Sequence, residues 1–258
     1  MDSLLFATTP EQVRDLVAKG RNVNEQFDRG PTPLYMAFLN KRFSVAAELI
    51  RNGAVPEDNM IYTAVFDDRV DILEEFLKQG NSPNPFCQGH STRFFMWGEK
   101  ENIFTRACEK GYFDIIDCLF KYGLDINQID YNEGLTHCCR NGYDILVQKL
   151  ISLGAITTVF DMVSAINNNH LNIIDILMFN GFNANSTIYG YSMLMYSIVM
   201  GRNEAAERLL NYSLDINFID DNGNTALFLT NDKRMIDLLI ANGCDPEIRN
   251  SSGERYCD

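Results

Sequence analysis

Cysteine and histidine are the residue types in this sequence with the clearest capacity for chemistry. His137 directly precedes Cys138 and Cys139, and Cys108 and Cys118 lie upstream. Thiolates and imidazoles can hold zinc, or can form a nucleophile with its base. Zinc sites usually contain closely spaced ligand pairs such as C-x₂-C, and this spacing is absent from the sequence. The spacing therefore argues against a zinc site.

The histidines His90, His137 and His170 are too few and too scattered to indicate acid–base catalysis. The sequence also contains no G-x-x-x-x-G-K, G-x-G-x-x-G, G-x-S-x-G or H-E-x-x-H pattern. Phosphate-binding loops, the nucleophile elbow and the zinc-protease helix therefore have no motif to support them. We expect no enzymatic activity, no cofactor and no bound metal ion.

The composition is typical of a soluble globular protein, because 46% of the 258 residues are hydrophobic and 22% are charged. The net charge of −13 repels phosphate backbones and anionic lipid heads, so we expect neither nucleic acid nor a membrane as partner. The same charge favours a basic protein partner. Residues 1–6 lack the features of a signal peptide, and the seven cysteines are an odd number. We expect a monomer in the cytoplasm.

The elements that must position any functional residues follow from an internal repeat. A pattern of two apolar residues, two variable residues and usually a glycine recurs at intervals of 27 to 43 residues. A glycine at this place ends a helix, because it adopts the left-handed conformation without steric cost. Ser213 is the one exception, and serine must take that conformation at higher cost. The units end near Gly20, Gly53, Gly80, Gly123, Gly154, Gly181, Ser213 and Gly243.

A second interruption lies twelve residues before these markers, most clearly at Gly111, Gly142, Asn169 and Gly201. Apolar residues of helical period lie between the two interruptions, and a shorter helix precedes the first. Thr32 and Pro33 are a typical helix start, a capping residue followed by proline in the first turn. Each unit is therefore predicted to be helix, turn, helix and loop.

This pattern resembles the ankyrin repeat over nearly the whole chain. Residues 107–127 read ACEKGYFDIIDCLFKYGLDIN, and residues 32–37 read TPLYMA, close to the T-P-L-H-x-A signature. The segment 220–227, DDNGNTAL, is similar to the hairpin and helix start of the family. The resemblance implies an all-α solenoid of stacked helix-turn-helix units with short hairpin loops. We expect one such domain over residues 1–258.

Several units depart from the family pattern. The first unit lacks a hairpin and has a short first helix, as a terminal unit should. The units ending at Gly80 and Gly181 are short, so their hairpins should be reduced turns. The last unit has lost about three residues of its first helix, and residues 250–255 begin another hairpin. An insertion occupies about residues 86–101.

The resemblance also explains most of the cysteines. Cys108, Cys138 and Cys139 fall on small alanine positions, Cys118 falls on a core leucine position, and Cys244 falls on the alanine before the loop. Free cysteine behaves as a small buried hydrophobic residue. We therefore expect these five cysteines to pack in the core.

In this family the first helices and hairpin tips form a concave binding face, and the resemblance implies that face here. For the inserted Phe94, Phe95 and Trp97 two interpretations stay open, a contact with the partner or a plug between neighbouring units. The predicted partner-binding residues are Arg29, Leu39, Asn40, Phe66, Asp67, Phe94, Phe95, Trp97, Lys110, Tyr131, Arg140, Tyr189, Tyr191, Met200 and Asp221.

The function that the sequence favours is a non-enzymatic module that binds a protein partner. An alternative is an inhibitor or immunity-type protein that occludes a basic enzyme, and another is an effector or adaptor acting in a host cytosol. The acidic residues 67, 68, 71, 74 and 75 either form a solvated helix face or steer a basic partner. The contexts of Asn127 and Asn217 also resemble sites that asparaginyl hydroxylases modify in ankyrin domains.

Overall fold

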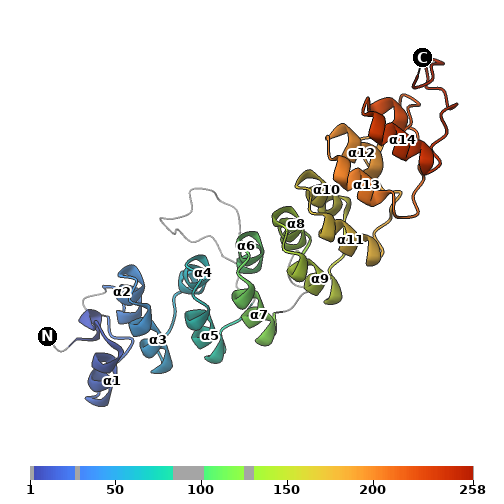
Figure 1. Ribbon diagram of the computed structural model, residues 1–258. Coiled ribbons are helices and arrows are strands. Elements are labelled where there is room, and N and C mark those ends of the chain that lie inside the picture. Colours follow the sequence, from blue (N-terminus) through green and yellow to red (C-terminus); the bar gives the residue numbers. More distant parts are fainter. Residues whose placement is uncertain (1–2, 27–29, 84–101, 125–130, 258) are drawn as a thin grey trace. The chain divides into compact units, whose positions relative to one another are not determined.

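The computed structural model describes residues 3–26, 30–83, 102–124 and 131–257, which belong to two compact units (Figure 1). The N-terminal unit covers Met1–Asp130 and the C-terminal unit covers Tyr131–Asp258. The predicted insertion at residues 86–101 lies outside the described residues. The organisation of residues 1–258 as one domain stays a prediction.

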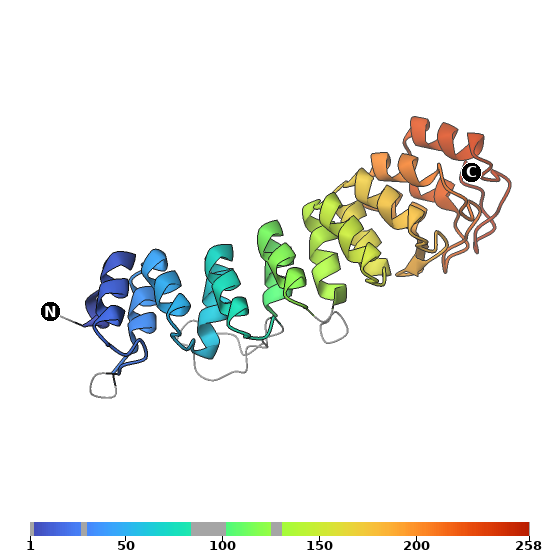
Figure 2. The same cartoon turned by 90° about the horizontal axis from the view of Figure 1, so that it is seen from below.

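The N-terminal unit is a row of stacked helix pairs (Figure 2). In the first unit the 3₁₀ turn η1 takes the place of a first helix, packs against α1 and also contacts α2 of the next unit. Each later unit consists of a first helix and a second helix joined by a tight turn. The first helices are α2, α4 and α6, and the second helices α1, α3, α5 and α7 contact one another in order. Its elements are η1 (Leu4–Phe6), α1 (Pro10–Ala18), α2 (Pro33–Leu39), α3 (Phe43–Arg51), α4 (Asp58–Phe66), α5 (Val70–Lys78), α6 (Ile103–Lys110) and α7 (Phe113–Lys121).

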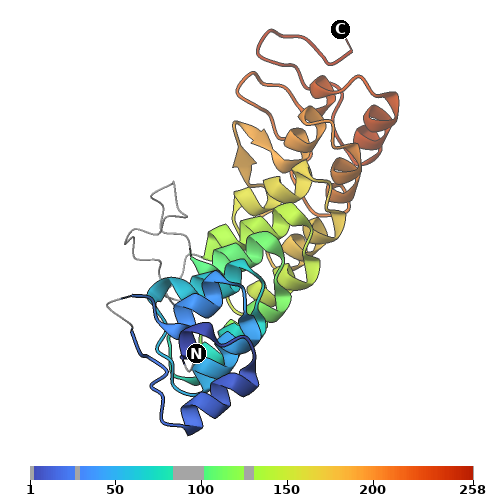
Figure 3. The same cartoon turned by 90° about the vertical axis from the view of Figure 1, so that its left-hand side faces the viewer.

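The C-terminal unit repeats this arrangement and adds a short hairpin. The hairpin and the two turns that follow it in later repeats project on one side of the helices (Figure 3). The first helices are α8, α10 and α12, and η3 takes this place in the last pair. The elements are α8 (Tyr131–Asn141), α9 (Asp144–Ser152), α10 (Val159–Asn167), α11 (Leu171–Phe179), β1 (Thr187–Ile188), β2 (Tyr191–Ser192), α12 (Met193–Val199), α13 (Asn203–Leu209), η3 (Ala226–Leu229) and α14 (Lys233–Ala241).

The fold class is therefore confirmed. Helices dominate both units, and the β1–β2 pair is the one sheet found within the described ranges. The helices begin where the sequence predicts, because the Thr32 hydroxyl accepts the Tyr35 N–H at 3.1 Å and Pro33 occupies the first turn. Ser192 caps α12 in the same way through the Met195 N–H.

The helix ends confirm the physical reason for the repeated glycines. Seven of the eight predicted unit ends carry a glycine with positive φ. The turn inside each of the six α-helix pairs from α2–α3 to α12–α13 also contains a left-handed residue, which is Gly142 in one pair and Asn169 in the next. The following residue then donates its N–H to the carbonyl five residues back, as in His170 to Ala165 at 2.9 Å. This closure satisfies carbonyls that a helix end would otherwise leave unpaired.

Ser213 corrects one prediction. It does not adopt the left-handed conformation that the repeat pattern assigns to it. Helix α13 instead ends at Leu209, four residues earlier, and Tyr212 N–H bonds to the Leu209 carbonyl at 3.0 Å. Because a serine side chain makes the left-handed conformation costly, the chain leaves the helix early instead.

The other irregular units are as predicted. Residues 54–57 and 155–158 replace two hairpins with short connectors, and η3 is a 3₁₀ turn of 4 residues where the last unit is shortened. A turn closes from Asn250 N–H to the Glu254 carbonyl at 2.9 Å. The five cysteines expected in the core, Cys108, Cys118, Cys138, Cys139 and Cys244, are all buried.

Candidate protein-binding surface

The C-terminal ends of the first helices place apolar side chains in solvent. Leu39 is the last residue of α2 and Phe66 is the last residue of α4, so the two side chains occupy the same position in successive repeats. Leu39 is 64% exposed and Phe66 is 48% exposed, whereas most apolar residues of these helices are buried. In the C-terminal unit, Val199 ends α12 at the equivalent position, and Val199 and Met200 are both exposed. We call Leu39 and Phe66 the first-helix surface of the N-terminal unit, and Val199 and Met200 form a separate exposed apolar pair in the C-terminal unit.

The Phe66 ring is held in a defined position by its neighbours. The Tyr62 ring lies 6.4 Å away on the same helix, and the Arg106 guanidinium lies 4.7 Å from the Phe66 centroid. Arg106 in turn pairs with Glu109 at 2.9 Å, and Lys110 pairs with Glu109 at 3.0 Å. Burial opposes ionisation of Glu109, but these two cations outweigh it and hold the pKa of Glu109 below its usual range. The contacts with Tyr62 and Arg106 therefore order the Phe66 ring within the chain itself.

Three of the predicted polar contacts already have roles within the N-terminal unit. Asn40 is exposed, but its amide donates to the Met36 carbonyl at 2.7 Å and so caps α2. Asp67 is half-buried and lies 3.9 Å from Lys41. Lys110 is exposed and pairs with Glu109. These residues border the first-helix surface, but any partner must compete with these contacts.

Two of the predicted residues in the C-terminal unit, Arg140 and Met200, are exposed. Arg140 is exposed near the end of α8, and its carbonyl accepts a hydrogen bond from His170 Nε2 at 3.0 Å. His170 is thus a structural turn residue that ties one repeat to the previous one. Met200 lies in solvent directly after α12.

The hairpin tip contains three more of the predicted residues. Tyr189 lies at the tip of β1–β2 and is 80% exposed. Asp221 is exposed in the next turn of the chain. Tyr191 is only partly accessible, because its ring packs against the core of the last repeats around Leu194 and Leu227. The tip therefore exposes Tyr189 and Asp221 to solvent, and Tyr191 mainly supports it.

Five predicted contacts have no described side chain. Arg29, Phe94, Phe95 and Trp97 lie outside the described residues, and for Tyr131 only the backbone of α8 is described. They stay predictions.

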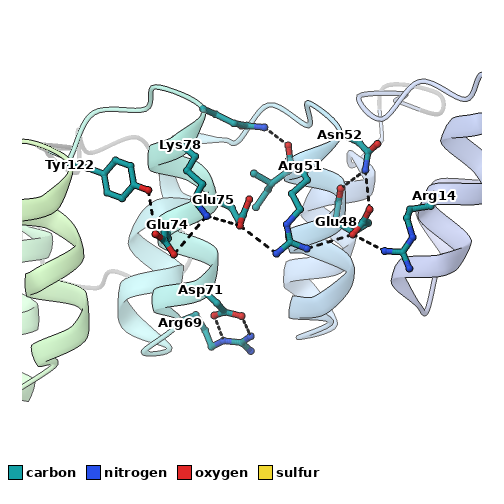
Figure 4. A network of polar contacts seen from close by, with 12 residues as sticks. Arg14, Glu48, Arg51, Asn52, Arg69, Asp71, Glu74, Glu75, Lys78 and Tyr122 are labelled. Atoms are coloured by element: carbon teal, nitrogen blue, oxygen red, sulfur yellow. Dashed lines mark hydrogen bonds and ion pairs between the residues drawn. The ribbon is translucent and has the colours of Figure 1, made fainter.

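The acidic cluster of α5 is largely paired within the N-terminal unit (Figure 4). Glu74 accepts hydrogen bonds from Lys121 at 2.7 Å and from the Tyr122 hydroxyl at 3.3 Å. Glu75 pairs with Arg51 at 3.3 Å and with Lys78 at 3.2 Å. The hydrogen bond from Lys121 is the main reason why the pKa of Glu74 lies below its usual range.

The same side chains form a ladder of ion pairs across the second helices. Arg14 of α1 reaches Glu48 of α3 at 3.1 Å, and Glu48 also lies 3.5 Å from Arg51 (Figure 4). The sequence reasoning missed this ladder. Its signal was a basic residue two places before the glycines that end three units, namely Arg51, Lys78 and Lys121. The negative charge of α5 therefore serves the packing of repeats and is less available to a partner.

Three buried thiols of the described residues, Cys118, Cys139 and Cys244, show no sign of activation. Burial raises the pKa of the Cys139 thiol, and the nearby Asp161 carboxylate adds to this effect. Burial likewise raises the pKa of Cys118 and Cys244. Within the ranges that the structure describes, no group of three or more His, Cys, Asp or Glu residues is placed to hold a metal ion. A protonated buried thiol is a poor nucleophile and a poor metal ligand.

Among the described helices, none is long and apolar enough to cross a lipid bilayer.

Comparisons with known proteins agree with this architecture. A family model described as ankyrin repeats in three copies matches residues 162–250. A curated relative, putative ankyrin repeat protein FPV031 of Fowlpox virus (strain NVSL), is 27% identical over 163 residues, which is 55% of this chain. The match spans 48% of that relative, about half its length.

A solved structure shares the fold. The crystal structure of the ankyrin repeat domain of Bcl-3, described as a unique member of the IkappaB protein family, matches with a TM-score of 0.64. The match covers 82% of this chain and 99% of that domain, at 19% sequence identity. The repeated helix pairs, the left-handed turns and these matches lead to the same conclusion. The chain has the ankyrin-repeat fold, and its residues 162–250 match the ankyrin-repeat family model.

Proposed function

We propose that this chain is a non-enzymatic module that binds a protein partner with its first-helix surface and hairpin tip. Ankyrin repeats generally act as protein–protein interaction modules. The single observation that carries the proposal is the exposure of apolar residues, Leu39, Phe66 and Val199, at the last position of three first helices, α2, α4 and α12. Exposure of apolar side chains to water is unfavourable, and a partner that covers them removes this cost.

The energetics favour the aromatic member of this surface as the main contact. Phe66 is already ordered by Arg106, so a partner that covers it loses little side-chain entropy on binding. Aromatic residues and arginines that are ordered in this way are the residue types that most often dominate binding energy. Truncation of such a residue typically costs about 2 kcal/mol of binding free energy, or roughly thirtyfold in Kd.

The alternatives are less well supported by the charges. An inhibitor of a basic enzyme would need free carboxylates, but Glu74 and Glu75 are engaged by lysine and arginine side chains of the same unit. The effector or adaptor role, the cytoplasmic location, the monomeric state and the absence of nucleic-acid and membrane partners stay predictions. We retain a protein partner as the proposal.

Affinity capture tests this function. The tagged chain should retain a partner from its native cell, and the double variant Leu39→Ala/Phe66→Ala should lose most of it. A matched control is Phe179→Ala, which removes an exposed aromatic side chain from second helix α11. If the double variant captured as much partner as the wild type, the assignment of the first-helix surface would be wrong.

A further inference from the structure

The tip of the β1–β2 hairpin has an unusual backbone. Tyr189 has φ 51° and Gly190 has φ 80°, while Thr187 pairs with Ser192 and Ile188 pairs with Tyr191. Two central residues with positive φ define the tight hairpin turn that matches the twist of the strands. Glycine is ordinary at this place, but a bulky aromatic residue with positive φ is rare. The turn therefore holds the Tyr189 ring outward in solvent, in a conformation that tyrosine does not favour.

The next turn brings a carboxylate to this tip. A Cβ atom added to Gly190 would lie 3.0 Å from Asp221 Oδ2, so the Asp221 carboxylate lies directly against the glycine. Asp220 fixes this turn from below, because its buried Oδ1 accepts the N–H groups of Asn222 at 2.8 Å and Asn224 at 2.9 Å. Asp221 thus lies on a neighbouring turn, against the residue that directly follows Tyr189.

The Asp221 carboxylate has no counter-charge. It is exposed, and it makes no ion pair or hydrogen bond with any described side chain. The turn at residues 250–254 contacts Asn222 through the Ser251 N–H, and the basic residues beside that turn are engaged elsewhere. Arg249 donates to the Gly253 carbonyl at 2.6 Å, and Arg255 pairs with Glu247 at 3.3 Å. The tip therefore combines an exposed aromatic face with an uncompensated negative charge.

We infer that Tyr189 and Asp221 together receive a lysine or arginine side chain from a basic segment of the protein partner. This inference rests on the proposed function and specifies the chemistry of its hairpin-tip contact. A cation is attracted to the face of an aromatic ring, and the neighbouring carboxylate attracts the same charge. A neutral apolar segment would fit less well, because it would leave the Asp221 charge without water and without a partner.

The roles of the two side chains are separable. The ring of Tyr189 supplies the cation–π surface, so its hydroxyl is not needed for this contact. Asp221 supplies the charge, so removal of that charge weakens the contact even though the shape is preserved. Gly190 supplies the space that lets the carboxylate approach the tip.

An NMR titration of the full chain tests the inference. The probe is a twelve-residue peptide of alternating arginine and serine, and a peptide of alternating glutamate and serine is the negative probe. We expect the basic peptide to shift the amide signals of Gly190 and Asp221 and the ring signals of Tyr189, and the acidic peptide to leave them unchanged. Shifts caused equally by both peptides, or shifts confined to other loops, would overturn the inference.

The variants separate a specific contact from general attraction to an acidic protein. Asp221→Asn and Tyr189→Ala should each raise the Kd for the basic peptide about threefold, and Tyr189→Phe should bind the peptide as tightly as the wild type does. Asp237→Asn changes the net charge equally at an exposed position of α14 and is the matched control. Equal weakening by Asp221→Asn and Asp237→Asn, or weakening by Tyr189→Phe, would refute the contact as described.

Failure of this inference is distinguishable from failure of the proposed function. The peptide titration uses only the hairpin tip, whereas the capture experiment uses the Leu39 and Phe66 variants. If the peptide does not bind but the capture is lost in Leu39→Ala/Phe66→Ala, the partner engages the first-helix surface without a basic segment at the tip. The intact hairpin of each variant is checked through the amide signal of Ser192.

Discussion

Asp161 is a fully buried carboxyl group whose removal should be costly. It lies in the first turn of α10, and its two oxygens accept three hydrogen bonds. The donors are the Thr136 hydroxyl at 2.6 Å, the Thr158 N–H at 2.6 Å and the Thr158 hydroxyl at 2.9 Å. These bonds tie α8 to α10 and close the N-terminus of α10 in a capping box.

The magnitude follows from the groups that lose their acceptor. Asp161→Ala removes the acceptor of the Thr158 N–H and of two hydroxyls, and each buried donor that loses its acceptor costs about 1–3 kcal/mol. Because the hydroxyls can rotate toward other acceptors, we expect a total loss of about 2–4 kcal/mol in the free energy of unfolding. Asp161→Asn keeps an acceptor for the Thr158 N–H and should remain within about 1 kcal/mol of the wild type at neutral pH.

The pH dependence of stability provides a second, independent test of the buried carboxyl group. Burial raises the pKa of Asp161 in the folded chain, although its hydrogen bonds oppose this. The folded state therefore holds the proton more tightly than the unfolded state, and protonation stabilises the fold. The wild type should gain stability relative to Asp161→Asn as pH falls through the raised pKa, with the full gain below the pKa of an unfolded aspartate.

Urea denaturation followed by circular dichroism measures these differences, and hydrogen exchange of residues 131–170 assigns them to the C-terminal unit. Asp237→Ala, at an exposed position, is the control and should change stability by less than about 0.5 kcal/mol. If Asp161→Ala were as stable as this control, or if the wild type lost stability relative to Asp161→Asn on acidification, the reasoning about the buried carboxyl would be refuted.

Three further predictions concern the turns, the thiols and the ion-pair ladder. Gly142→Ala should destabilise the chain by about 1–2 kcal/mol more than Gly53→Ala in thermal unfolding. The reason is that a Cβ added at Gly142 lies 2.7 Å from the His170 ring, whereas one added at Gly53 meets nothing within 4 Å. Equal losses of stability in the two variants would contradict the clash. Among the described cysteines, a thiol reagent should label native Cys257 first, because it is the exposed one, and rapid labelling of buried thiols would contradict the core packing. Arg51→Ala should cost about 0.5–1 kcal/mol in urea at low ionic strength and less at about 1 M salt, whereas a loss independent of salt would exclude the ion pairs as its cause.

The sequence predicted the fold well because the repeat is encoded locally. A glycine such as Gly53 or Gly123 ends its helix through its own backbone freedom, and no distant residue is needed. The same reasoning identified Asn169 as a turn residue but not Lys41 or Asp68, which also have positive φ. Lysine has no preference for this conformation and aspartate adopts it only occasionally, so neither marks a turn as clearly as glycine does.

The candidate surface was predicted less completely because exposure depends on distant neighbours. Leu39 and Tyr189 are as exposed as the repeat pattern implies, since each occupies a position that no later repeat covers. Tyr191 is covered because the following repeat places its core beside the hairpin. The acidic residues of α5 looked free for a similar reason: Lys121, which pairs with Glu74, lies 47 residues away in the sequence.

Hydrogen–deuterium exchange of the chain with its captured partner tests the central claim most directly. The account predicts slower exchange at the C-terminal ends of α2, α4 and α12 and in the segments 187–192 and 220–224 when the partner is bound. The second helices α3, α5 and α11 should exchange as they do in the free chain. Protection confined to those second helices, with none at the first-helix ends or the hairpin tip, would contradict the account.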